Sequence, residues 1–206
     1  PEGIRWLGTS IASLSTLQSV LVVGSNLRKD HPLFAQRIRQ AARHGCQVIA
    51  LDSVERDWAI PVKHLLKHAA SQWVLALGGI AAAVAQEKGV AGPAGSFVID
   101  DAATAVARSL MAGERKAVLL GNAAAHHAQA TQLLALANWI GEHTGATVGY
   151  LTEAANTVGA QFVGAHPVKG GLNAAQMLSG GLKAVLLLNN EPVHDSSVGA
   201  RATDAL

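Results

Sequence analysis

The segment from Ser19 to Pro32 constrains the fold of this chain more than any other. Residues 20–23 are four consecutive apolar residues, and the run ends at Gly24. A short apolar run without polar alternation predicts a strand that is buried on both faces, as in parallel sheets. Small and polar residues follow, and Pro32 predicts the first turn of a helix. The segment therefore predicts a strand that delivers a loop to the carboxyl edge of a parallel sheet, where ligands bind in open α/β folds.

The loop after Gly24 matches neither of the common glycine-rich phosphate-binding patterns. Gly24 is not followed by glycines at the G-x-G-x-x-G spacing, so the loop is not a dinucleotide fingerprint. Lys29 has no glycine before it and no Ser or Thr after it, which excludes a P-loop.

Strand and helix patterns alternate along the rest of the chain. Apolar runs predict strands at 46–51, 117–120, 147–151 and 184–188. Helical spacing and terminal glycines predict helices at 32–44, 73–88, 102–111, 124–144, 156–165 and 173–179. The segment 53–67 is predicted to be irregular. This alternation predicts an α/β fold with a mostly parallel sheet and helices on both faces. We expect Val20–Val23 and Ala184–Leu188 to be interior strands of the same sheet.

The chain reads as one α/β region built from two βα halves, 14–113 and 114–206. It begins at Pro1 without a methionine and stops soon after the last predicted strand. We therefore expect it to be a fragment of a longer subunit.

Composition excludes several classes of function. Half of the residues are hydrophobic, only 15% are charged, and the net charge is +2, which argues against nucleic acid as a partner. No apolar run of about 18 residues exists, so we expect no membrane-spanning segment. Cys46 is the sole cysteine, which excludes an internal disulfide and an all-cysteine iron–sulfur cluster on this chain alone.

No set of residues in the sequence forms a complete active site or metal site. His126 and His127 are adjacent and would point about 100° apart on a helix, so they do not favour a shared metal. His64 and His68 share a helical spacing, but nothing converges on them. Asp100-Asp101 is interpreted as a helix N-cap rather than a catalytic pair. The basic residues Arg28, Lys29, Arg37, Arg39 and Arg43 could bind phosphate or an acidic neighbour, or form a solvated helix face.

Four segments, taken in order, resemble the molybdopterin oxidoreductase superfamily, which includes formate dehydrogenases and DMSO reductases. They are Gly24-Ser-Asn-Leu-Arg-Lys-Asp-His-Pro32, Ala117-Val-Leu-Leu-Gly-Asn122, Thr152-Glu-Ala-Ala-Asn156 with Gly159-Ala160, and Gly181-Leu-Lys-Ala-Val-Leu-Leu-Leu-Asn-Asn-Glu-Pro192. Within the superfamily, residues 24–32 resemble the branch of the large peripheral-arm subunit of bacterial NADH-quinone oxidoreductase, respiratory complex I. The resemblance covers nearly the whole chain and implies a Rossmann-like fold of that superfamily's central domains.

The resemblance implies a set of vestigial cofactor-binding residues at strand ends. They are Gly24, Ser25, Asn26, Asp52, Gly121, Asn122, Asn190 and Pro192. Two positions depart from the cofactor-binding members: Leu27 stands where they usually have Pro, and Ser53 follows Asp52 in place of a Pro-Arg pair. These departures favour a cofactor-free structural and docking domain without molybdopterin. The alternative is a working domain that binds a molybdopterin guanine dinucleotide.

The resemblance to the complex I branch also implies partners and a location. The expected partners are other peripheral-arm subunits, in an assembly that passes electrons from NADH through iron–sulfur clusters to quinone. In that branch the clusters lie in an N-terminal region that this chain lacks. The expected location is the cytoplasmic side of the bacterial inner membrane, without direct insertion, and the fragment alone is expected not to be catalytic.

Overall fold

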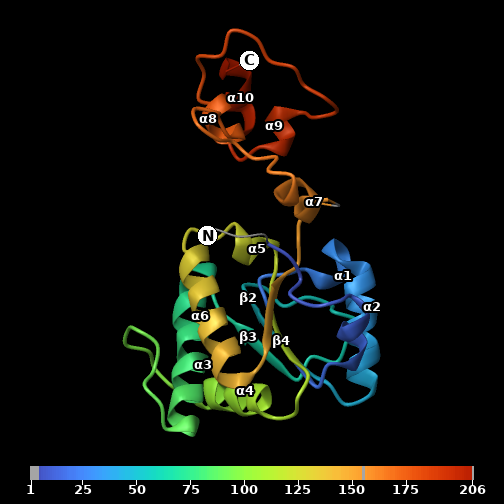
Figure 1. Cartoon of the computed structure of the whole chain (residues 1–206), viewed down its shortest axis with the longest axis vertical. Coiled ribbons are helices and arrows are strands. Elements are labelled where there is room, and N and C mark those ends of the chain that lie inside the picture. Colours follow the sequence, from blue (N-terminus) through green and yellow to red (C-terminus); the bar gives the residue numbers. More distant parts are fainter. Residues whose placement is uncertain (1–4, 155, 206) are drawn as a thin grey trace. The chain divides into compact units, whose positions relative to one another are not determined.

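The chain divides into two compact units. The computed structural model describes residues 5–154 and 156–205 (Figure 1). Unit 1 comprises Pro1–Val158 and unit 2 comprises Gly159–Leu206, with the division inside helix α7 (Thr157–Phe162).

Unit 1 is built around a five-stranded sheet in which every pairing is parallel. The strand order is β3-β2-β1-β4-β5. The strands are β1 (Ser19–Val23), β2 (Gln47–Asp52), β3 (His64–Lys67), β4 (Lys116–Leu120) and β5 (Thr147–Tyr150). The chain moves outward from β1 to β3 on one side and from β4 to β5 on the other. The order of the strands therefore reverses between β1 and β4, which makes that boundary the topological switch point.

Helices cover both faces of this sheet, as Figure 1 shows. One face carries α3, α4 and α6, and the other carries α2 with a short 3-10 turn at Ala12–Thr16. The bounds in unit 1 are α1 (Leu27–Asp30), α2 (Pro32–Arg43), α3 (Trp73–Lys88), α4 (Asp101–Met111), α5 (Asn122–Ala125) and α6 (Ala130–Thr144), with a second 3-10 turn at Ala70–Gln72. The predicted α/β fold with a parallel sheet and helices on both faces is confirmed for unit 1.

The two sheet faces bury separate apolar cores because side chains alternate along each strand. In β1, Leu21 and Val23 face α3, α4 and α6, whereas Val20 and Val22 face α2. All five residues of β1 and all five of β4 are buried. Apolar runs that lack alternation are therefore explained by helices on both sides.

The N-terminal segment covers the outer edge of β5. The main-chain nitrogen of Tyr150 donates a hydrogen bond to the carbonyl oxygen of Trp6 at 2.8 Å. Leu7 packs so closely that a Cβ atom added to Gly149 would lie 1.9 Å from the Leu7 carbonyl oxygen. The first described residues thus lie directly against the last strand of the sheet.

Two predicted segments of unit 1 differ from the structure. The segment 53–67, predicted to be irregular, ends in the edge strand β3, which is only four residues long and alternates little in burial. The predicted helix 124–144 is two helices, α5 and α6, because the chain turns between them, where the amide nitrogen of Gln129 donates to Nδ1 of His127 at 2.9 Å.

The predicted strand at Ala184–Leu188 is wrong: these residues form no strand. A strand needs a neighbour for its N–H and C=O groups, and no other strand lies in the described part of unit 2. Leu186 and Leu188 are 94% and 88% exposed. The remaining elements of unit 2 are α8 (Ala174–Met177), α9 (Pro192–Asp195), a 3-10 turn at Gly199–Arg201 and α10 (Ala202–Ala205).

Among the described residues, no helix has both the length and the apolar character needed to cross a bilayer.

Candidate functional site

Loops from three adjacent strands meet at the switch point. Gly24 follows β1, Asp52 ends β2, and Gly121 follows β4. The amide of Gly24 donates to the carbonyl of Leu51 at 2.8 Å, and the amide of Gly121 donates to that of Val23 at 2.8 Å. The sheet hydrogen bonding therefore continues one residue past β1 and β4. It brings the loops at 24–26 and 121–122 together, as expected for residues at the carboxyl ends of parallel strands.

Gly24 is in contact with an indole ring. Its φ of +60° lies in the left-handed region that favours glycine. A Cβ atom there would lie 2.6 Å from Cζ3 of Trp73 and 2.8 Å from the amide nitrogen of Ala124. Trp73 is 2% exposed and its indole N–H donates to the carbonyl of His68 at 3.1 Å. The position that a Gly24 side chain would take is therefore filled by the Trp73 ring and the start of α5.

Gly121 is needed for the same kind of close packing. A Cβ atom on Gly121 would lie 2.4 Å from Cβ of Ser25 and 2.5 Å from the carbonyl oxygen of Gly24. That carbonyl accepts a hydrogen bond from the amide of Ala123 at 3.0 Å. The two loops thus close against each other at Gly121, which leaves no room for a side chain there.

Two polar atoms at this junction remain buried without a partner among the described residues. They are Oγ of Ser25 and Oδ1 of Asn122. The whole Ser25 residue is only 3% exposed. Leaving such a group unpaired costs on the order of 1–3 kcal/mol, which a bound water or a polar ligand atom would offset. These two atoms are the feature of the junction that points to a ligand.

Asp52 is buried but fully engaged in local contacts. Its carboxylate accepts hydrogen bonds from the amide of Ser53 at 2.7 Å and from Nε of Arg56 at 2.9 Å. Arg56 is the ion-pair partner four residues along the chain. Asp52 therefore fixes the turn after β2, and its oxygens are already occupied.

Asn26 and Leu27 continue the loop toward α2. The amide of Asn26 donates to Oδ2 of Asp30 at 3.3 Å, which closes the single turn α1. Leu27 is 1% exposed and belongs to the core beneath α2. The residue that stands in place of proline is thus a core side chain.

Histidines connect these loops to the segment after β5. Nε2 of His31 donates to the carbonyl of Thr152 at 2.7 Å, and Nε2 of His126 lies 2.6 Å from Oε2 of Glu153. His31 also stacks on Phe34, with ring centroids 5.6 Å apart. Residues 152–153 therefore lie next to the loops that follow β1 and β4.

Two of the candidate residues, Asn190 and Pro192, lie in unit 2. Asn189 has a φ of +48°, which asparagine tolerates better than most residues, and Pro192 starts α9. Asn190 and Pro192 line a cavity of about 160 Å³ whose other walls are mainly apolar. Neither residue follows a strand, because Ala184–Leu188 forms none.

The other polar candidates serve local structure. Asp100 caps α4 by accepting from the amide of Ala103 at 2.7 Å, as expected. His127 stacks on Trp73, with centroids 5.7 Å apart, and so completes the packing over Gly24. Cys46 is buried, which raises the pKa of its thiol to about 11. No group of three or more His, Cys, Asp or Glu residues in the described ranges could hold a metal ion.

The basic cluster divides into paired and unpaired residues. Arg28 forms an ion pair with Asp57, whose pKa is lowered by the hydrogen bond from the amide of Ala59 and by Arg28 itself. Arg37, Arg39 and Arg43 have no carboxylate within ion-pair distance among residues 5–154 and 156–205. All three are exposed on α2.

Sequence reasoning placed the switch-point loops correctly but missed the contacts across them. The sequence did not predict the contacts of three residues, Trp73, His31 and His126, because their partners lie far away in the chain.

The sequence profile of the molybdopterin oxidoreductase family matches residues 3–206. A search of curated proteins finds no match to the chain.

Proposed function

The chain belongs to the molybdopterin oxidoreductase family, and we propose that it is a cofactor-free structural and docking domain of the large peripheral-arm subunit of respiratory complex I. In this role it takes part in an oxidoreductase that passes electrons from NADH through iron–sulfur clusters to quinone. The clusters belong to other parts of that subunit and its neighbours. Residues 24–32 support this branch of the family through the resemblance of the whole loop.

The observation that carries the cofactor-free role is the packing over Gly24. In cofactor-binding members the matching loop holds the nucleotide part of the molybdopterin cofactor. Here the Trp73 ring and the start of α5 fill the space beside Gly24, and Ser25 fills the space beside Gly121. Leu27 supports the same role because it is part of the core. The junction therefore contributes to stability and holds the two loops in a fixed arrangement.

Native purification tests the assignment to complex I. The tagged protein is isolated from membranes in mild detergent, and NADH oxidation, quinone reduction and molybdenum content are measured on the same sample. We expect NADH-quinone reductase activity to co-purify, without stoichiometric molybdenum. Stoichiometric molybdenum in a sample that does not oxidise NADH would contradict the proposal.

The second candidate is a working cofactor domain that binds a molybdopterin guanine dinucleotide. The unpaired Oγ of Ser25 and Oδ1 of Asn122 favour it, since both atoms can hydrogen-bond a polar ligand. When bound, that cofactor supplies the molybdenum redox centre. On this chain Ser25 and Asn122 would be the residues to hold its polar groups.

Titration with GDP separates the two candidates. We expect a Kd weaker than about 1 mM, which corresponds to about −4 kcal/mol. Asn26→Ala is the matched variant, because Asn26 is half-buried and lies at the mouth of the loop. Micromolar binding that Asn26→Ala abolishes would replace the structural role with the cofactor role.

A further inference from the structure

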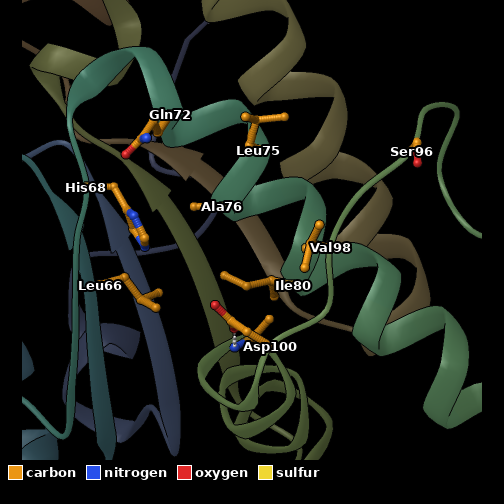
Figure 2. Close-up of a pocket in the computed structure, with 11 residues that line it drawn as sticks. Leu66, His68, Gln72, Leu75, Ala76, Ile80, Ser96, Val98 and Asp100 are labelled. Atoms are coloured by element: carbon orange, nitrogen blue, oxygen red, sulfur yellow. Dashed lines mark hydrogen bonds between the residues drawn. The ribbon is translucent and has the colours of Figure 1, made fainter.

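A cavity of about 270 Å³ lies in unit 1 at the outer edge of the sheet, between β3, the first half of α3 and the start of α4. Figure 2 shows it in close-up, with Gln72 at one end and Asp100 at the other. Its walls include neither Gly24 nor Gly121, so its occupancy is independent of cofactor binding at the switch point.

The floor of the cavity is apolar and belongs to the core. Leu66 is 7% exposed and belongs to the core cluster under α3 and α4, and half-buried Ala76 packs against that cluster. Gly79 lets the main chain at Val98 approach the helix closely, because a Cβ atom at this position would lie 2.6 Å from the Val98 carbonyl oxygen. An apolar ring or short chain laid on this floor would lose water contact on one face, which favours binding.

The Asp100 end of the cavity carries negative charge. Oδ1 of Asp100 accepts the capping hydrogen bond from Ala103, whereas Oδ2 has no partner among the described residues. Asp101 adds a second carboxylate at the same helix start. This end therefore favours a positively charged group with N–H donors.

The opposite end offers neutral hydrogen-bonding groups. Both main-chain polar groups of His68 are hydrogen-bonded. Its N–H donates to the main-chain carbonyl of Asp52, and its carbonyl accepts from the indole N–H of Trp73. Neither the His68 ring nor the Gln72 amide has a side-chain hydrogen bond within the described part of the chain. Both groups can donate and accept, so this end fits a hydroxyl group.

We propose that this cavity binds a small organic amine. The ammonium group lies at Asp100, and an apolar ring or chain lies over Leu66 and Ala76. A hydroxyl group at the far end of the ligand is hydrogen-bonded by His68 or Gln72. A cavity of about 270 Å³ has room for a small amine that carries one ring.

Three probes of nearly equal size test this assignment by NMR titration of the purified protein. Phenethylamine carries the ammonium group, tyramine adds a hydroxyl group, and 2-phenylethanol lacks the charge. We expect phenethylamine to bind with a Kd of about 1–10 mM, the range for a ligand of this size, and tyramine to bind more tightly. The amide shifts should concentrate at residues 66–80 and 96–103. 2-Phenylethanol should bind at least about threefold more weakly than phenethylamine.

Matched variants locate the charge. Asp100→Asn keeps a good N-cap for α4 but removes the carboxylate, and should weaken phenethylamine about three- to five-fold. Asp101→Asn removes the neighbouring charge outside the cavity wall and should change binding less than twofold. Equal effects of the two substitutions would overturn the assignment of the ammonium group to Asp100.

A second pair of variants locates the apolar body. Ala76→Leu places a larger side chain in the cavity and should abolish the shifts, whereas Ala82→Leu, half-buried on the same helix outside the cavity, should preserve them. Thermal unfolding of each variant checks that it folds. Absence of shifts with 20 mM phenethylamine, or unchanged binding by a folded Ala76→Leu protein, would overturn the proposal.

Discussion

The two units follow the same local rules but differ in burial. Unit 1 buries every residue of β1 and β4. In the described part of unit 2, Ala202 alone is buried. Nevertheless, unit 2 contains a complete capping box, in which Asn173 and Gln176 exchange hydrogen bonds at 2.9 Å. Gly180 has the left-handed φ of +93° expected after a helix.

Helix capping therefore does not depend on the burial of side chains. Caps and glycine turns need only residues three to five positions apart, so they form in both units. Burial needs partners from distant segments, and unit 1 supplies them through five adjacent strands. Paired substitutions, one in each unit, therefore test the comparison directly.

The largest difference is expected for a buried charge. Val22→Asp places a carboxylate between α2 and the sheet at a position that is fully buried, and should cost more than about 4 kcal/mol or prevent folding. Leu186→Asp changes a residue that is 94% exposed and should cost less than about 0.5 kcal/mol. Urea unfolding measures both. A Val22→Asp protein as stable as wild type would contradict the central position of β1.

Glycine substitutions separate packing from backbone strain. Gly24→Ala introduces both a left-handed alanine and a clash with Trp73, and should cost about 2–4 kcal/mol. Gly180→Ala also places an alanine at positive φ, but nothing lies within 4 Å of the added Cβ atom, so it should cost only about 1–2 kcal/mol. Urea midpoints at constant m-value give both quantities. Equal costs would mean that Trp73 does not fill the space over Gly24.

The two N-caps give a finer comparison. Asp100→Ala removes a cap from α4, an 11-residue helix packed on the core, and should cost about 1 kcal/mol. Asn173→Ala removes a cap from the four-residue exposed helix α8 and should cost less than about half of that. Hydrogen exchange at Ala103 and Gln176, the two capped amides, reports each loss locally. Similar losses of protection would show that burial adds nothing to a cap.

The smallest effect concerns alkaline pH and unit 1 alone. Burial raises the pKa of the Cys46 thiol from 9.0 to about 11, so the folded state disfavours the thiolate. This contribution to stability is complete below pH 9 and is lost as the pH rises toward 11; at pH 9.5 the loss is under ~1 kcal/mol. Urea unfolding at pH 8 and pH 9.5 measures it. The Cys46→Ala protein should show a smaller decrease, and an identical decrease would contradict the assignment to Cys46.

Sequence patterns predicted the elements that carry strong local or periodic signals. α2 has Pro32 at its start and Gly45 after its end, α3 stops at a left-handed Gly89, and β1 and β4 are uninterrupted apolar runs. The edge strand β3 was missed because four residues give too short a pattern. Residues 184–188 have the apolar composition of a strand. A strand also needs a neighbouring strand to pair with its main chain, and composition does not show whether one is present.

For the candidate site, the sequence predicted the location at the carboxyl edge of the sheet but not the side-chain contacts there. Glycine and small residues after β1 and β4 marked the carboxyl edge of the sheet. The Trp73 ring over Gly24 and the bond from His31 to Thr152 join residues far apart in the chain. Such contacts follow from the packing of whole elements, and single-sequence periodicity carries no information about them.

The hydrogen bond between Tyr150 and Trp6 has a consequence for the order of folding on the ribosome. Trp6 is synthesised before all five strands, whereas β5 is the last strand of the sheet to be synthesised. Until β5 emerges, Trp6 and Leu7 lack the strand against which they lie, and β4 has an open side. Closing so long a loop is entropically costly and slow. The β1-α2-β2 portion can form early during translation, but the far side of the sheet can close only after residue 150 has been made.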